Sequence, residues 1–597
     1  MRHSLLVGFS SLAFCAASPT PAPFAQTAVQ DIYQGDGWTL ATRADFYSRD
    51  QGSRMIPLAW LNALTQPNGQ PFAGDALGRY GYLPNPDNAL GLPVGFSTSG
   101  PTGIETVGMT CSACHTRQIT VAGQAWRIDG GPALVDFQAL LADLDSAVGA
   151  VLASDAAFAP FAASVLASPA PDPDDVLTLR QDVGAWYLRF HTIISLSLPD
   201  TPWGLGRLDA IGMIFNRVTG LDIGPPPSFI IADNIHKADA PARYPFLWNA
   251  SRQDKTQWPG FAANGSDVLA LARNLGEVFG VFAIYQPQKI GDFVDYVANN
   301  SANFEGLEKL EKLIKLIQPP PWQWTLDSSL ANQGKDIFYR KAADGGCAEC
   351  HDSGPGPQRF PFEQTLKTPI TDAGTDTREL GVLDWTVKTG ALQGGYAFAT
   401  PRPLGETDTA FNTLATSVVG SIVGHAFFGG LNGALAHIPL PQMQPGATAA
   451  LLARHLPRQL RELESAFRSQ AIIAGEALSA RPQGLAPAAV GARPAPYESR
   501  VMNGIWAAAP YLHNGAVPTL AELLKPAAQR VAAFKVGPAY DIDTVGLAVD
   551  QPSPLATLRQ TTDCSDVNSG NSRCGHEFGT SLTDSEKKAL LEYLKSL

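Results

Sequence analysis

Two short cysteine-histidine motifs carry the clearest chemical pattern in this 597-residue chain. Residues 111–115 read C-x-x-C-H, and residues 347–351 repeat the same spacing. In such a motif both cysteines add covalently to haem, and the histidine that follows binds the iron from one face. The pattern therefore predicts two covalently bound haem c groups, held by Cys111, Cys114, His115, Cys347, Cys350 and His351.

Three cysteines remain of the seven in the chain. Cys15 lies in the apolar N-terminal stretch, whereas Cys564 and Cys574 lie in a loop rich in Ser, Asn and Gly. An oxidising compartment favours a disulfide between Cys564 and Cys574, and two free thiols are the alternative. Closing so short a loop would stabilise the fold by about 2–3 kcal/mol on the chain-entropy model.

The N-terminus has the pattern of a secretory signal peptide. A brief polar start is followed by the mostly apolar residues 4–17, and we place the signal at residues 1–25. A lipoprotein signal at Cys15 is the weaker interpretation, because Phe14 is bulky for that pattern. No other apolar run reaches spanning length, so we expect a periplasmic or secreted protein with no stable membrane span.

The amino-acid composition indicates a globular protein and argues against one class of binding partner. Hydrophobic residues make up 45% of the chain and charged residues 16%, which is typical of a globular protein. The net charge of −12, without a Lys/Arg-rich run, argues against a nucleic-acid partner. The 56 glycines and 47 prolines favour long loops between short helices.

The expected fold is mainly α with long irregular loops, arranged as two cytochrome c-like haem lobes elaborated by extended loops and inserted helices. Three prolines at 319–321 cannot continue a helix, so they separate an N-terminal lobe, 26–318, from a C-terminal lobe, 322–597. A capping box of Thr583 and Glu586 opens the last helix, which we expect to pack on a helix at 331–338. Apolar periodicity predicts further helices at 134–144, 182–198, 268–282, 304–317 and 451–473.

The reactivity of each iron depends on the ligand at its second axial position. His513 is the leading candidate for such a ligand, because a loop framed by Pro, Asn and Gly could hold its imidazole at a fixed point. Met443 is a weaker candidate. For any other histidine, a structural role is the simpler interpretation.

The two C-x-x-C-H motifs together with residues 511–520, YLHNGAVPTL, resemble the di-haem cytochrome c peroxidase superfamily. The chain length, the long gap between His115 and His351, and the 248–280 region are similar to the branch of rubber oxygenases and di-haem fatty-acid dioxygenases. The resemblance implies that His351 and His513 both bind the C-terminal haem, which transfers or stores electrons. It also implies that the N-terminal haem at His115 binds O₂.

Aromatic side chains line the O₂ pocket in that family. Trp248, Trp258, Phe261 and Phe279 are the candidates here, and Trp258 and Phe261 are the two we assign to the catalytic pocket beside His115. Core packing is the alternative for each of these aromatic residues.

The leading functional hypothesis is an oxygenase that adds O₂ to a C=C bond of a long apolar olefin, either an unsaturated fatty acid or polyisoprene. A small redox protein is a further candidate partner, as electron donor. The alternative is a peroxidase that reduces H₂O₂, which needs an acid/base group over the first haem, and Glu277 is the candidate. A third hypothesis, a pure electron-transfer cytochrome, requires strong second ligands at both irons.

Overall fold

The computed structural model describes residues 28–597 except 291–292, 360–361, 398–401 and 429–495. The predicted signal peptide, the helix at 451–473 and Met443 lie outside the described residues.

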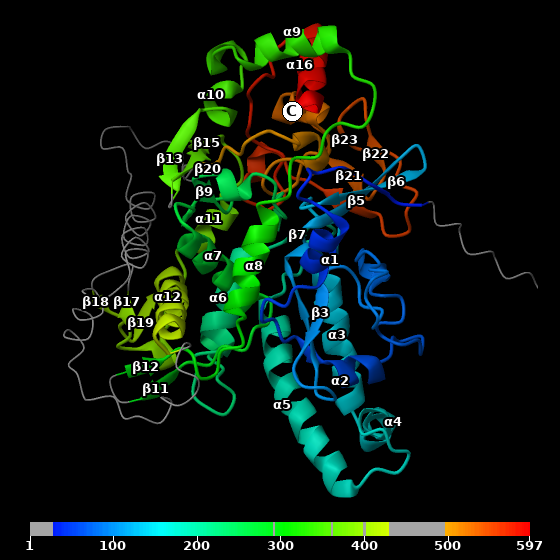
Figure 1. Ribbon diagram of the computed structural model, residues 1–597, viewed down its shortest axis with the longest axis vertical. Helices are drawn as coiled ribbons and strands as arrows, with labels where there is room; N and C mark the ends of the chain where they lie inside the picture. Colours follow the sequence, from blue (N-terminus) through cyan, green and yellow to red (C-terminus); the bar gives the residue numbers. More distant parts are fainter. Residues whose placement is uncertain (1–27, 291–292, 360–361, 398–401, 429–495) are drawn as a thin grey trace, which may run out of the picture.

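The N-terminal part of the chain forms a helical lobe at the lower end of the molecule (Figure 1). The side chain of Asp136 caps α3, and Asp172 with Pro173 opens α5 well before residue 182, where apolar periodicity placed its start. These helices share a hydrophobic core with a sheet of order β2-β4-β3. The bounds are α2 Leu58–Ala63, α3 Phe137–Leu152, α4 Asp155–Val165, α5 Pro173–Ser197, β2 Ile56–Pro57, β3 Phe96–Ser99 and β4 Thr106–Met109.

A three-stranded sheet of order β1-β6-β5 follows the first motif directly. Strands β5 (Thr116–Val121) and β6 (Gln124–Asp129) form a hairpin, and β1 (Gln30–Asp31) pairs with β6 in parallel. The two residues of the turn, Ala122 and Gly123, have φ of +48° and +83°, which matches the turn preferred between twisted strands. The sequence analysis predicted no hairpin at this point.

The last helix closes the C-terminal part, as predicted. Helix α16 (Asp584–Ser596) opens with the Thr583–Glu586 capping box and packs against α9 (Ser328–Phe338). The rings of Phe338 and Tyr593 meet at 5.3 Å, and a side chain at Gly334 would collide with the backbone of Ala589. Both predictions, the capping box and the pairing of these two helices, are confirmed.

A third group of helices combines α6 (Ala210–Phe215), α7 (Asp267–Gly280) and α8 (Phe304–Ile314), from the chain between the two motifs, with α12 (Ala410–Phe428), which follows the second motif. Helices α7 and α8 pack together, and α7 also contacts α6 and α12. A buried π-helical turn, Asn216–Leu221, continues α6. Such turns often occur at functional sites.

Short elements make up the remainder. The other helices are α1 Leu40–Ser48, α10 Ala348–His351, α11 Arg378–Val382 and α15 Leu520–Leu523. The other strands pair as β7 Arg207–Leu208 with β8 Ala242–Arg243, β9 Lys255–Thr256 with β10 Ala262–Ala263, β11 Gln288–Ile290 with β12 Phe293–Asp295, β13 Pro355–Arg359 with β14 Glu363–Leu366, β15 Ile370–Asp372 with β20 Pro496–Glu498, β16 Thr386–Lys388 with β19 Thr407–Thr409, β17 Tyr396–Ala397 with β18 Arg402–Pro403, β21 Ala533–Val536 with β24 Thr557–Gln560, and β22 Tyr540–Asp541 with β23 Gly546–Leu547.

The prediction of a mainly α fold is wrong. Among the described residues 38% are helical and 17% lie in strands, and the strands form many small sheets, so the fold is mixed α/β. Most strands have two to five residues, which is too short for alternation of apolar and polar residues to be visible in the sequence. Segments rich in Gly and Pro, which looked like loops, pair in short hairpins instead.

One hydrophobic cluster joins residues from both sides of the proline stretch. It contains Phe46 and Ile128 from before residue 319 and Trp506 and Leu590 from after it. The indole nitrogen of Trp506 donates to the carbonyl oxygen of Pro320 (2.8 Å). The division into lobes 26–318 and 322–597 stays a prediction.

Among the described residues no single helix is both long and apolar enough to cross a membrane, although α3 and α4, bent by 107° relative to each other, have the length and composition as a pair.

Candidate functional site: two haem-attachment motifs and an apolar cavity

The first motif is wound into one tight turn. The amides of Cys114 and His115 both donate to the carbonyl oxygen of Cys111, at 3.3 and 3.0 Å. This winding brings residues i, i+3 and i+4 to one side of the turn, where all three can reach the same flat group. Gly95 has φ of +84° and packs directly against the backbone of Ala113, a position where a Cβ atom would clash.

His115 is held in one orientation by a backbone carbonyl. Its Nδ1–H donates to the carbonyl oxygen of Pro245 (2.8 Å), which leaves Nε2 as the unprotonated nitrogen. Burial lowers the pKa of His115 to about 4, and the Pro245 bond opposes that shift only in part. A neutral imidazole with a free Nε2 is the form that binds a metal.

The second motif repeats this design on the short helix α10. The amides of Cys350 and His351 donate to the carbonyl oxygen of Cys347, at 3.2 and 3.0 Å. Nδ1–H of His351 donates to the carbonyl oxygen of Arg500 (2.8 Å), and burial lowers the pKa of His351. Both imidazoles are therefore oriented in the same way.

Strand β8 and Arg500 connect the two motifs. The guanidinium of Arg500 donates to the carbonyl oxygen of Phe246 (3.0 Å), one residue after the Pro245 carbonyl that holds His115. The amide of Arg243, on β8, donates to the carbonyl oxygen of His513 (2.8 Å). The backbone segments that orient His115 and His351 are thus connected to each other by a small number of hydrogen bonds.

His513 lies in a buried loop and is 6% exposed. Its ring stacks on Tyr497 with 3.9 Å between ring centres and an interplanar angle of 16°. Burial lowers the pKa of His513 to about 3, and the charge of Arg243 acts in the same direction. His513 is thus a neutral imidazole in a rigid setting, as expected for a ligand, but its ring contact is with a tyrosine.

A second histidine, His576, lies opposite the ring of His351. The two ring centres are 6.3 Å apart, with an angle of 44° between the planes. Nδ1 of His576 is buried without a hydrogen-bond partner, and its pKa falls to about 3, chiefly through burial and then through the charge of His351. Metal–imidazole bonds are about 2 Å long, so two imidazoles on one metal ion place their ring centres roughly 6 Å apart.

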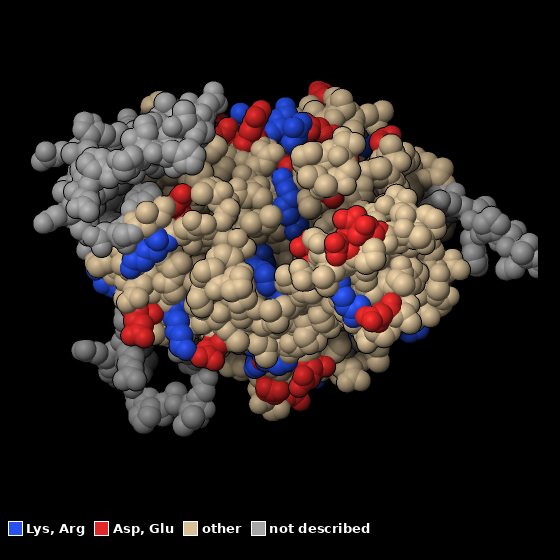
Figure 2. All heavy atoms as spheres, turned by 90° about the horizontal axis from the view of Figure 1, so that it is seen from below, with Lys and Arg blue, Asp and Glu red and all other residues tan. Residues whose placement is uncertain are grey.

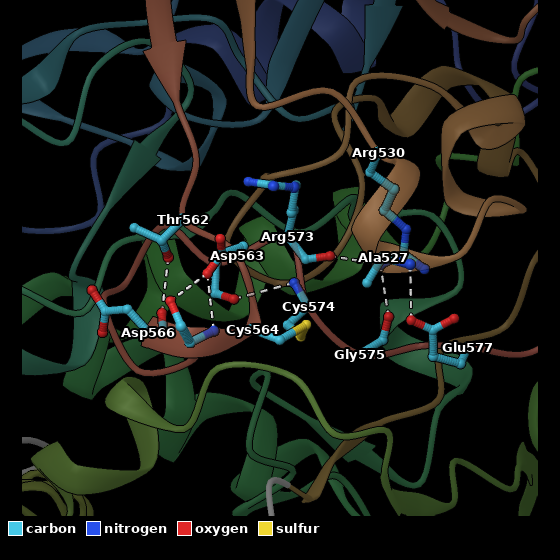
Figure 3. The surroundings of a disulfide bond; sticks show 12 residues. Ala527, Arg530, Thr562, Asp563, Cys564, Asp566, Arg573, Cys574, Gly575 and Glu577 are labelled. Carbon is cyan, nitrogen blue, oxygen red and sulfur yellow. Dashed lines mark hydrogen bonds between the residues drawn. A yellow bond between two sulfur atoms is a disulfide. The ribbon is translucent and has the colours of Figure 1, made fainter.

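The segment that carries His576 is fixed by a disulfide and an arginine (Figure 3). The sulfur atoms of Cys564 and Cys574 are bonded, with their Cα atoms 5.3 Å apart. The guanidinium of Arg530 donates to the carbonyl oxygens of Arg573, Gly575 and His576, at 2.7, 2.7 and 3.0 Å. His576 itself has φ of +51°, a conformation that a non-glycine residue adopts only when its surroundings impose it.

An apolar cavity of about 70 Å³ lies among α6, α7 and α12. Phe261, one of the two aromatic residues assigned to the catalytic pocket, lines it and meets the ring of Phe411 edge-on at 5.9 Å. The wall is mostly aliphatic and aromatic, formed by Ile211, Ile214, Phe215, Phe261, Leu269, Phe411, Leu414, Ala415 and Val418.

Three polar side chains form one end of this cavity. Nε2 of Gln257 donates to Oε1 of Glu277 (2.8 Å), and Arg273 is paired with Glu311 at 2.7 Å. Burial raises the pKa of Glu277, and the charge of Arg273 opposes that rise. Burial raises the pKa of the Cys111 thiol and that of Cys114, and the negative charge of Glu277 adds to both shifts, so Glu277 lies within electrostatic range of the first motif.

The other aromatic candidates lie away from the cavity. Trp258 donates from its indole nitrogen to the carbonyl oxygen of Arg243 (2.9 Å), and its ring lies under the guanidinium of Arg243 at 4.6 Å. Trp248 stacks on Phe246 at 4.8 Å, and Phe279 stacks on Tyr285 at 4.4 Å, both within the core. Phe261 and Glu277 therefore line one cavity, whereas Trp258 is not among its lining residues.

The donor set fits covalently bound haem at both motifs. All four motif cysteines are free thiols with partly accessible side chains, whereas Cys564 and Cys574 are oxidised to a disulfide. Each motif also presents a neutral imidazole with its Nε2 free, oriented through Nδ1. Two thiols and one oriented imidazole on a single turn are the groups that haem c attachment needs.

Comparisons with known proteins agree with this donor set. Residues 496–535 match a family described as RoxA-like, cytochrome c-like. The matched segment contains Arg500, which orients His351, and also His513. The match supports a RoxA-like cytochrome family and a haem oxidoreductase, and a cytochrome c-like domain implies covalently bound haem c.

Two relatives come from Sinorhizobium fredii. The uncharacterized protein y4iJ is 27% identical over 612 aligned residues, which cover 94% of this chain and 92% of that protein. The uncharacterized protein y4iM is 31% identical over 121 residues, which cover 17% of this chain and 27% of that protein.

Sequence reasoning passed over two residues of the site. His576 sits in a polar loop that gave no periodic signal, but its position two residues after a disulfide cysteine marks it as fixed. Gln257 directly precedes Trp258, and its partner Glu277 was named without a position in space. Only the fold shows that residues twenty apart in the chain share one cavity wall.

Proposed function

We propose that this protein is a haem-dependent oxygenase that adds O₂ to a C=C bond of a long, apolar olefin at the first motif. The observation that carries the proposal is the apolar cavity with Glu277 in its wall, a carboxyl group close enough to act electrostatically on Cys111 and Cys114. A haem held by these cysteines and His115 would supply the redox chemistry that activates O₂. Unsaturated fatty acids and polyisoprene are the substrate classes.

The cavity walls position the olefin and exclude water. Apolar side chains such as Phe261, Leu414 and Val418 gain contact with a hydrocarbon chain and offer no hydrogen bonds to water. Arg273 is occupied by Glu311, so the segment of substrate inside the cavity is held by apolar contact and not by an ion pair.

Glu277 favours a second candidate function, reduction of H₂O₂. Burial raises the pKa of this carboxyl group, so it holds a proton more readily beside the cavity, and Gln257 fixes one of its oxygens. A positioned acid of this kind contributes about 10²–10⁴-fold to peroxide chemistry. Glu277→Gln separates the candidates, because it should abolish peroxide reduction and leave O₂-dependent oxygenation of an olefin unchanged.

At the second motif we propose an electron-transferring haem, which His351 and His576 would hold. The 6.3 Å separation of the two rings and the unpartnered Nδ1 of His576 support this pairing. His513 is the alternative that the sequence favoured. A small redox protein is the proposed electron donor, and the periplasm or the cell exterior, where disulfides form, is the proposed location.

Two substitutions that change the cavity volume in opposite directions test whether the reaction takes place beside this cavity. Leu414→Trp fills it, so olefin oxygenation should fall at least tenfold while the haem absorbance per protein stays constant. Val418→Ala enlarges the same cavity and should retain activity within a few-fold. Equal activity in both variants would place the reaction elsewhere.

A further inference from the structure

Three buried arginines lie between the two motifs with unused hydrogen-bond donors. Arg117, Arg243 and Arg500 are 0%, 5% and 6% exposed. Nε and Nη2 of Arg117, Nη1 of Arg243 and Nε of Arg500 are buried without a partner. A guanidinium that is removed from water and left partly unpaired is strongly unfavourable, so such a group calls for an anion.

These arginines form one electrostatic group. Burial lowers the pKa of Arg243 to about 9, and the charges of Arg500 and Arg117 lower it further, so the three groups act on one another. The carboxylate that faces them is Glu498, which accepts a hydrogen bond from Arg500 at 2.5 Å. Burial raises the pKa of Glu498 to about 7, so at neutral pH the three guanidinium groups leave a net charge of at least +2.

Each arginine is tied to one of the motifs. Arg117 is two residues after His115 on β5, and the carbonyl oxygen of Arg500 orients His351. Arg243 lies on β8, two residues before the Pro245 carbonyl that holds His115, and its Nε donates to the carbonyl oxygen of Leu512 (2.9 Å). The uncompensated positive charge therefore lies next to the backbone segments that orient both motif histidines.

We propose that Arg117, Arg243 and Arg500 form one site for the propionate carboxylates of the two haems, and that it raises both reduction potentials. The inference rests on the proposed binding of haem at both motifs. Haem carries two carboxylates, which suit the planar fork of arginine. A shared site would also couple the two haems electrostatically, since each propionate would lie near the cations that face the other haem.

Other buried arginines show how the chain normally satisfies this side chain. Arg217 and Arg359 also leave Nε unpaired, but each faces carboxylates, Asp222 for the first and Asp267 for the second. Arg559, 5% exposed, directs its guanidinium to the carbonyl oxygens of Gly515 and Leu205. Arg117 and Arg243 differ from Arg217 and Arg359, because each keeps an unpaired donor and forms no ion pair with a carboxylate among the described residues. Arg117 otherwise donates to the carbonyl oxygens of Pro132 and Ala509, and Arg500 is the one of the three that pairs with a carboxylate, Glu498.

The test is an anaerobic redox titration of the purified holoprotein, followed by visible absorbance without olefin or peroxide. Arg243→Gln and Arg117→Gln should each lower the midpoint potential of at least one haem, because loss of a positive charge disfavours the reduced form. We expect the ratio of reduced to oxidised haem at fixed potential to fall about tenfold, which is 59 mV for a one-electron couple. Arg243→Lys keeps the charge and should restore most of the shift.

Arg559→Gln is the matched control, since it removes a buried arginine that already has carbonyl partners. Potentials that change no more in Arg243→Gln and Arg117→Gln than in this control would overturn the propionate site. Wild-type potentials that depend on added inorganic phosphate would assign the site to a free anion and also overturn it. Intact mass separates the two proposals, because absence of covalent haem would contradict the proposed function itself.

Discussion

The two motif histidines are oriented by the same kind of hydrogen bond, but different side chains lie near each of them. His115 and His351 each donate from Nδ1 to a backbone carbonyl at 2.8 Å, so their ligand strength should be similar. A second imidazole, His576, lies opposite His351, whereas the first motif lies within electrostatic range of Glu277, which lines the apolar cavity. This asymmetry supports a reactive first haem and an electron-transferring second haem, because an iron with two strong protein ligands has no open site.

Replacing His576 tests the ligand assignment at single-residue resolution. His576→Ala should convert the second haem from a low-spin to a high-spin spectrum, because one axial ligand is lost. His513→Ala removes the ring stacked on Tyr497 and should leave that haem low-spin. Electron paramagnetic resonance of the oxidised proteins distinguishes the spin states, and the reverse pattern would assign the ligand to His513.

At the scale of elements, the disulfide loop fixes the segment that carries His576. Cys564 and Cys574 are ten residues apart in the chain, and Arg530 binds the carbonyl oxygens of Arg573, Gly575 and His576, on both sides of Cys574. Cys564→Ser with Cys574→Ser should lower the free energy of unfolding by about 2–3 kcal/mol, because the unfolded chain gains freedom. Denaturant titration measures this change. Unchanged stability relative to wild type would show that Arg530 alone holds the segment.

The start of α16 should make stability depend on pH. Arg340, at 2.7 Å, and the Thr583 amide lower the pKa of Glu586 to about 2. A carboxyl group with a depressed pKa contributes stability above its unfolded value near 4.5, and this contribution is lost as the pH falls toward 2. Glu586→Gln keeps the capping bond but not the charge, so its urea midpoint should lie below that of wild type at pH 7 and match it near pH 2. A difference in urea midpoint between Glu586→Gln and wild type that stays the same at all pH values would contradict this account.

The sequence predicted those elements whose signals are local. The Thr583 capping box and the apolar stripe of α16 were visible because each depends on residues within one or two turns. No hairpin was predicted at the two-residue Ala-Gly turn between β5 and β6, and the many two-residue strands had no detectable period. Contacts such as His351 with His576, or Phe261 with Phe411, join residues more than 100 positions apart, and no local pattern encodes them.

At the scale of the whole molecule, the two motifs belong to one connected structure. The cluster that contains Phe46 and Trp506 spans the proline stretch, and Arg500 links the carbonyl groups that orient both histidines. On the face shown in Figure 2, acidic and basic side chains are interspersed over a mostly uncharged surface. A redox partner would therefore find no broad single-sign patch on this face, and docking there would depend on local pairing of charges.

Incubation of the purified holoprotein with oleate or with polyisoprene under ¹⁸O₂, without peroxide, tests the central claim most directly. The proposal predicts a product that carries ¹⁸O at or beside the former C=C bond, seen by mass spectrometry. It also predicts that Leu414→Trp loses this product, because the cavity beside the first motif would be filled. Product that forms only after H₂O₂ is added, or that carries no ¹⁸O, would contradict the oxygenase and favour the peroxidase.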